Sequence, residues 1–136
     1  MSRLSLSLLV VIAALPACRI SDPAPFALEA GQNFAVIAIE GQPAPEGVTL
    51  EVVEPGRLAG QAPCNRWFAN FNQDAATLRI GPAGATRMAC LEDERMSAES
   101  DFFAALEAVD SIADGPDGEV LLTKGGKPRI TLRRAP

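Results

Sequence analysis

Residues 60–90 constrain the fold of this chain more than any other stretch. They contain two of the three cysteines, Cys64 and Cys90, and the only tryptophan, Trp67. They also hold the densest run of residues that favour β-strands. A link between the two cysteines would tie an aromatic strand to the far end of the segment. We therefore expect the rest of the domain to close around residues 60–90.

Residues 1–17 have the pattern of a secretory signal peptide, with Arg3 near the start, an apolar run and a small-residue exit at Ala17. The apolar run is shorter than the roughly 20 residues that span a bilayer. Residues 15–18 (Leu-Pro-Ala-Cys) resemble the bacterial lipobox, in which the cysteine is lipidated and becomes the new N-terminus. We expect Cys18 to be lipidated and residues 18–30 to form a tether. The alternative is ordinary cleavage after Ala17, which leaves a free thiol.

Lipidation of Cys18 also accounts for the odd number of cysteines in an exported chain. Several acyl chains anchor a protein stably where one chain is marginal. The inner-membrane retention signal of enteric bacteria is an Asp after the cysteine, whereas this chain has Arg19. We expect an outer-membrane lipoprotein that faces the periplasm.

Export predicts a disulfide between Cys64 and Cys90, because the periplasm is kept oxidising. Two other interpretations are a buried pair of free thiols and a redox function. A redox function is the weaker of these, since the chain has no Cys-x-x-Cys motif, in which a thiol pKa is lowered.

Alternating apolar residues and turn signals predict six or seven short strands, at residues 33–40, 49–53, 57–60, 67–72, 77–80, 119–123 and 129–133. One helix is predicted between residues 92 and 109, where Phe102, Phe103, Leu106 and Val109 form an apolar stripe. Its start is compatible with Ser97 as the cap or with a position near Glu92. The predicted fold is mainly β with one α-helix: a single domain at residues 31–134, with a small antiparallel β-barrel-like sheet and the helix packed against it.

The composition disfavours several functions. With 12 basic and 17 acidic residues the net charge is −5, whereas nucleic-acid binding needs clustered Lys and Arg. Without histidine the chain cannot assemble Ser–His or Cys–His activation or a histidine-based zinc site. The acidic run at residues 92–94 is typical of a solvated helix start. We therefore expect no catalytic residues, no metal site and no cofactor.

Several short motifs follow one another in an order that is also found in a known protein family. They are residues 57–60 (Arg-Leu-Ala-Gly), 64–66 (Cys-Asn-Arg), 81–82 (Gly-Pro) and 86–90 (Thr-Arg-Met-Ala-Cys), followed by the predicted helix. Together they resemble the META domain of HslJ-like proteins over roughly residues 31–133. Two positions depart from the family pattern: Phe34 stands where a Trp is usual, and Ala62-Pro63 replaces the common Gly before Cys64.

The resemblance implies a small β-barrel-like fold with one helix and no catalytic residues. It also implies an envelope protein linked to heat shock and antibiotic tolerance. The family-motif residues Asn65, Thr86, Arg87 and Met88 are interpreted as structural. An Asn such as Asn65 bonds the backbone of its own turn, and Met88 would fill an irregular gap in the core. For Arg87 we favour a structural ion pair over a ligand contact.

The leading functional hypothesis is a non-enzymatic, lipid-anchored envelope protein that binds or stabilises another envelope component in stress tolerance. One alternative is a small-ligand carrier that uses the barrel interior. A second is a protein inhibitor of an envelope hydrolase that acts through an exposed loop. An interior filled by aromatic and apolar side chains would argue against the carrier; the candidates for this filling are Trp67, Phe68, Phe71, Phe102 and Leu106.

Overall fold

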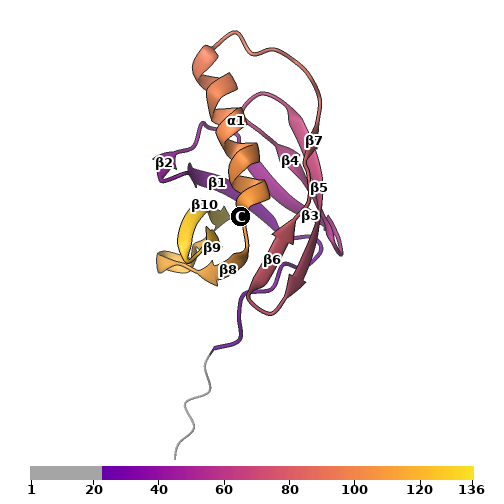
Figure 1. Ribbon diagram of the computed structural model, residues 1–136, viewed down its shortest axis with the longest axis vertical. Helices are drawn as coiled ribbons and strands as arrows, with labels where there is room; N and C mark the ends of the chain where they lie inside the picture. The colour runs from indigo at the N-terminus through magenta and orange to yellow at the C-terminus, as the bar shows by residue number, and fades with distance from the viewer. Residues whose placement is uncertain (1–22) are drawn as a thin grey trace, which may run out of the picture.

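The computed structural model describes residues 23–136, and the predicted signal peptide and Cys18 lie outside the described residues. In the described part, an antiparallel sheet of ten strands curves around one side of a long helix, α1 (Asp93–Ala108) (Figure 1). The predicted class, mainly β with one α-helix packed against the sheet, is confirmed. No helix in residues 23–136 has both the length and the apolar composition needed to cross a membrane.

The strands are β1 (Asn33–Ile39), β2 (Gln42–Pro43), β3 (Thr49–Glu54), β4 (Arg57–Gln61), β5 (Arg66–Asp74), β6 (Thr77–Ile80), β7 (Gly84–Ala85), β8 (Ser111–Asp114), β9 (Val120–Lys124) and β10 (Lys127–Arg134). A short 3₁₀ turn, η1 (Pro116–Gly118), precedes β9. Neighbours in the sheet follow the order β10-β9-β8-β6-β5-β4-β3-β1-β2, and β7 pairs with β5. Because β10 also pairs with β1, the sheet is ring-like.

All seven predicted strands are present, but the sequence patterns did not reveal β2, β7 and β8. The most important omission is β8, which pairs with β9 along its whole length and with β6 through Thr77 and Ser111. It therefore connects the two halves of the ring. Its sequence, Ser-Ile-Ala-Asp, has one strongly apolar residue, Ile112, so pairing with its neighbours rather than local propensity makes it a strand.

Helix α1 begins at the earlier of the two predicted positions. Glu92 is the N-cap residue, and Asp93 and Glu94 place negative charge in the first turn, where the helix dipole favours it. Ser97 lies inside the helix and is exposed, so it does not cap the start. The acidic run at residues 92–94 is solvent-exposed, as predicted.

The apolar stripe of α1 packs on the inside of the ring. Phe102, Leu106 and Val109 are buried, and Phe103 is half-buried. The Phe102 ring meets the Trp67 indole edge to face, with centroids 5.4 Å apart. Burial of a side chain the size of phenylalanine contributes about 1.5–3 kcal/mol, so this contact is a main link between the helix and the sheet.

Strand alternation decides which aromatic residues fill the interior. On β5, Trp67 and Ala69 point inward and are buried, whereas Phe68 between them is 51% exposed. The expectation that Phe68 fills the interior is therefore wrong, because neighbouring residues on a strand face opposite sides. Phe71 is half-buried at the edge of the core.

Candidate functional site

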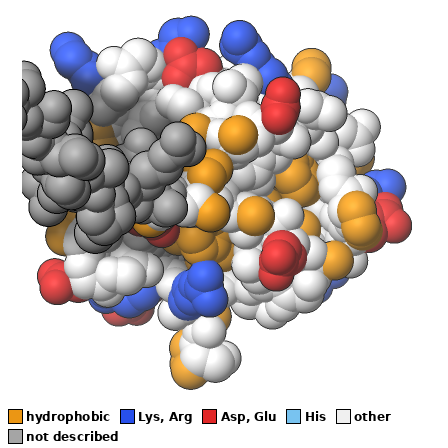
Figure 2. All heavy atoms as spheres, turned by 90° about the horizontal axis from the view of Figure 1, so that it is seen from below, with side chains coloured by type: hydrophobic (Ala, Val, Ile, Leu, Met, Phe, Trp, Pro, Cys, Tyr) orange, Lys and Arg blue, Asp and Glu red, His pale blue; other side chains and the backbone are white. Residues whose placement is uncertain are grey.

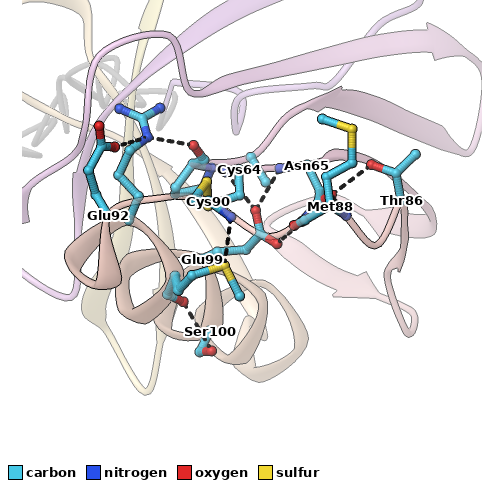
Figure 3. The surroundings of a disulfide bond; sticks show 12 residues. Cys64, Asn65, Thr86, Met88, Cys90, Glu92, Glu99 and Ser100 are labelled. Atoms are coloured by element: carbon cyan, nitrogen blue, oxygen red, sulfur yellow. Dashed lines mark hydrogen bonds and ion pairs between the residues drawn. A yellow bond between two sulfur atoms is a disulfide. The ribbon is translucent and has the colours of Figure 1, made fainter.

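The predicted disulfide is present and joins the turn after β4 to the segment before α1. The Cα atoms of Cys64 and Cys90 are 5.7 Å apart (Figure 3). This bond holds the end of the connection between β7 and α1, residues 86–91, which we call the 86–91 loop. The candidate functional site is this loop together with the side chains that hold it.

A buried carboxylate organises the turn beneath the loop. Glu99 on α1 is only 7% exposed. Its Oε2 atom accepts hydrogen bonds from the backbone N–H groups of Cys64 and Asn65, both at 2.7 Å. Its Oε1 atom accepts a 2.6 Å bond from Nδ2 of Asn65. Three N–H donors thus surround the buried carboxylate, which fixes the turn against the helix (Figure 3).

The side chain of Asn65 connects this turn to the 86–91 loop by hydrogen bonds. Its side chain is buried and binds both backbone groups of Met88: Oδ1 accepts from the Met88 N–H at 2.7 Å, and Nδ2 donates to the Met88 carbonyl at 3.1 Å. Oδ1 also accepts the Thr86 hydroxyl at 2.9 Å. With the bond to Glu99, both donors and both acceptor positions of the amide are used. The prediction that the Asn65 side chain bonds the backbone of its own turn is therefore wrong, because its partners are the loop backbone at Met88 and the side chains of Thr86 and Glu99.

Further contacts brace the two ends of the loop. The Thr86 N–H donates to the Arg66 carbonyl, and the Arg66 N–H donates to the Thr86 hydroxyl. At the other end, Arg95 donates from Nε to the Pro63 carbonyl at 2.9 Å. The Cys90 N–H points to the Met96 sulfur at 3.5 Å. The loop backbone is thus tied at its start, middle and end.

The side chains of the loop point outward although its backbone is held. Met88 is 67% exposed, Leu91 is fully exposed, and Met96 on the first turns of α1 is 39% exposed. We call these three residues the apolar patch. Met88 and Met96 also line a surface hollow of about 300 Å³ beside Asn65 and Glu99.

Two predictions for the loop side chains are wrong. Met88 does not fill a gap in the core, because Asn65 binds its backbone and leaves the side chain in solvent. Arg87 is exposed and makes no ion pair or hydrogen bond within the described part of the chain. Its charge is therefore available to a partner.

The acidic and sulfur groups at the centre of this site are bonded within the domain. Glu99, the buried acid, is already bonded to three N–H groups, and the two thiols are joined in the disulfide. In residues 23–136 no three His, Cys, Asp or Glu side chains lie close enough to hold a metal ion. The solvent-facing groups are thioethers, a leucine and a guanidinium, which suit contact with another protein.

From the sequence we did not predict a role for Glu99, although its position in the helix indicates one. It lies three and seven positions before Phe102 and Leu106, on the same helical face. A glutamate in an apolar stripe must find donors when that stripe is buried. Its partners, the N–H groups at residues 64 and 65, lie more than thirty positions away, so only the folded chain identifies them.

Comparison with known proteins is consistent with this fold. A family model described as "META domain" matches residues 27–136. Among solved structures, the chain is similar to the "NMR structure of the protein from Burkholderia xenovorans", with a TM-score of 0.63 and 19% sequence identity over 91% of this chain and 99% of that one. At this identity the likeness shows a shared fold alone. A search of curated proteins found no match.

Proposed function

The chain belongs to the META-domain family, and from this premise we propose that it is a non-enzymatic, lipid-anchored envelope protein that binds another envelope protein through the 86–91 loop. In the HslJ-like proteins that the motifs resemble, the domain is linked to heat shock and antibiotic tolerance. We propose the same role for this chain, in which it stabilises the bound partner under stress.

The observation that carries the proposal is an ordered backbone that displays apolar side chains. Exposed single hydrophobic residues are common, but Met88, Leu91 and Met96 come from one short stretch and lie next to a disulfide. A loop held by a disulfide and by the Asn65 and Glu99 hydrogen bonds loses little further conformational entropy on binding. Methionine side chains also adapt to the shape of a partner surface.

Charge indicates the chemistry of the partner surface. Arg87 lies between Thr86 and Met88 and has no counter-charge among the described residues. A partner that offers an apolar depression with a carboxylate at its rim would pair with both features. The partner is therefore proposed to be a protein with an acidic-rimmed apolar site.

The proposed anchor is the lipid on Cys18, which rests on the lipobox-like residues 15–18 and on the apolar run before them. Arg19 favours delivery to the outer membrane, with the domain in the periplasm. The expected disulfide chemistry of that compartment agrees with the bond between Cys64 and Cys90.

Of the two alternatives, the hydrolase inhibitor has an observation in its favour. A disulfide-held loop with exposed side chains is a suitable shape for insertion into an enzyme cleft. Inhibition of a purified cell-wall hydrolase by the wild-type protein and not by Leu91→Asp would distinguish it from a stabilising role. The carrier has less support, because Trp67, Phe102 and Leu106 are buried inside the ring.

Loss of the apolar patch is expected to remove function without unfolding the domain. In cells that lack the wild-type gene, the double substitution Met88→Ser and Leu91→Ser should fail to restore survival after heat or antibiotic stress. Both side chains are exposed, so the free energy of unfolding should change by less than about 0.5 kcal/mol. The measurement is colony survival, with protein level and thermal melting recorded for each variant.

The matched control is Val53→Ser, because Val53 is an exposed apolar residue on β3 outside the loop. This variant should restore survival like the wild type. Cys18→Ser tests the anchor in the same strain: the protein should move from the membrane fraction to the soluble fraction. Normal survival with the doubly substituted loop would refute the loop as the binding site, and unchanged fractionation of Cys18→Ser would refute the anchor.

A further inference from the structure

The segment before β1 is bound to the domain by one glutamine side chain. Gln73, near the end of β5, accepts the Leu28 N–H on Oε1 at 2.9 Å and donates from Nε2 to the Phe26 carbonyl at 2.6 Å. The same Nε2 group donates to the Ala75 carbonyl at 2.9 Å. Gln73 thus pairs with residues 26–28 as a neighbouring strand would. We call residues 26–28 the strap.

Side-chain packing holds the strap as well. The Phe26 ring meets the Phe34 ring edge to face, with centroids 6.1 Å apart, and the Arg134 guanidinium lies over its face at 5.1 Å. Gln32 accepts the Glu29 N–H at 3.0 Å, which secures the chain between the strap and β1. Part of the stretch expected to be a tether, residues 18–30, is therefore bound to the domain.

The strap fixes where the chain leaves the domain. In Figure 1 residues 23–29 run along the lower end of the molecule, beside the turn between β5 and β6, while the 86–91 loop lies at the upper end. Strap and turns enclose a surface hollow of about 410 Å³ at this lower end, lined by Pro25, Ala27, Leu28, Pro55, Gly56, Phe71, Asn72, Gln73 and Ala75. We call these residues the lower face. Figure 2, seen from below, shows apolar side chains over the middle of this end, with a few acidic and basic side chains among and around them.

The remaining chain is too short to let the domain turn freely. Phe26 follows Cys18 by eight positions. An extended chain advances at most about 3.6 Å per residue, so the lipid and the strap can be separated by roughly 29 Å at most. Because the chain leaves from the lower face, a lipid on Cys18 draws that face, rather than the upper end, toward the bilayer.

We propose that the strap orients the domain on the membrane, with the lower face toward the lipid bilayer and the 86–91 loop directed away from it. This inference rests on the lipid anchor of the proposed function. The net charge of −5 gives no general attraction to anionic lipids, so the attachment point of the tether sets the orientation. The partner of the loop then approaches from the periplasmic side.

The test compares the two ends of the molecule in vesicles. Full-length protein is expressed in cells, extracted from the membrane fraction and reconstituted in phosphatidylethanolamine and phosphatidylglycerol vesicles with nitroxide-labelled headgroups. A fluorescent amino acid is placed at position 72 on the lower face or at position 91 in the loop. Quenching should be several-fold stronger at position 72. The double substitution Phe26→Ala and Gln73→Ala should bring the ratio toward one, since it removes both strap hydrogen bonds and the ring contacts of Phe26.

The control is Asn70→Ala, an exposed residue on the same strand whose side chain makes no hydrogen bond within the described residues. It should keep the wild-type ratio. Equal quenching at positions 72 and 91 in the wild type would overturn the orientation, and an unchanged ratio in the Phe26→Ala and Gln73→Ala double variant would overturn the role of the strap. Recovery of the wild-type protein in the soluble fraction would instead refute the proposed anchor, and the orientation with it.

Discussion

Replacing Glu99 with alanine is expected to lower the free energy of unfolding by roughly 3–4 kcal/mol. The substitution leaves three N–H groups, those of Cys64 and Asn65 and the Asn65 amide, without their acceptor in a region that α1 and the loop cover. Each buried donor that loses its partner costs about 1–3 kcal/mol, and the loss is not fully additive because the space admits some water. Urea unfolding followed by far-UV circular dichroism measures the change.

A second substitution at position 99 separates the effect of the carboxylate charge from the effect of the size of the side chain. Glu99→Gln keeps the size of the side chain and one acceptor oxygen, but it presents an NH₂ group to a site that has only donors. The cost should be smaller than for alanine, about 2 kcal/mol. The control Asp101→Asn makes the equivalent change at an exposed position of the same helix and should alter stability by less than about 0.5 kcal/mol. Equal stability of Glu99→Gln and Asp101→Asn would show that the Glu99 carboxylate does not organise the turn.

Removal of the disulfide is expected to have an effect of similar size. The double substitution Cys64→Ser and Cys90→Ser opens a link between positions 26 residues apart. Chain-entropy arguments give about 3–4 kcal/mol for a loop of this length, mainly because the unfolded chain gains freedom. The expected result is a lower urea midpoint in the doubly substituted protein than in the wild type.

Amide exchange shows where the disulfide acts. Without the bond, exchange in the 86–91 loop should accelerate far more than in β9 and β10, because hydrogen bonds alone then hold the loop: those of Asn65 and Thr86, and the long contact from the N–H at position 90 to the Met96 sulfur. Both proteins are compared with Cys18→Ser also present, so that neither carries a lipid and they differ only in the disulfide. Unaltered loop exchange in the doubly substituted protein would contradict the idea that the disulfide keeps the loop ordered.

The strands that sequence analysis predicted share a local cause. In β3 and β6 the buried apolar residues alternate, and Pro55-Gly56 and Gly125-Gly126 mark the tight turns between neighbouring strands. Strand β8 lacks such a signal, since Ser111 and Asp114 give it the composition of a loop. It becomes a strand because β9 and β6 offer unpaired backbone groups on either side.

The candidate site could be predicted only in part, because most of its contacts join residues that lie far apart in the sequence. Export alone predicted the pairing of Cys64 with Cys90, which needs no knowledge of the fold. The prediction that Met88 fills an irregular gap in the core rests on the adaptable shape of its side chain, yet the Asn65 amide binds its backbone and leaves that side chain in solvent. A side-chain-to-backbone contact over 23 positions has no periodic pattern in the sequence, and the same holds for Glu99.

We propose that the 86–91 loop binds a protein partner in the envelope. Photo-crosslinking in living cells tests it most directly, with a benzophenone amino acid at position 91 in the loop and, for comparison, at position 70 on β5. The expected result is one discrete crosslinked envelope protein from position 91, weakened by Met88→Ser and absent from position 70. The same products from both positions, or no product from position 91, would contradict it.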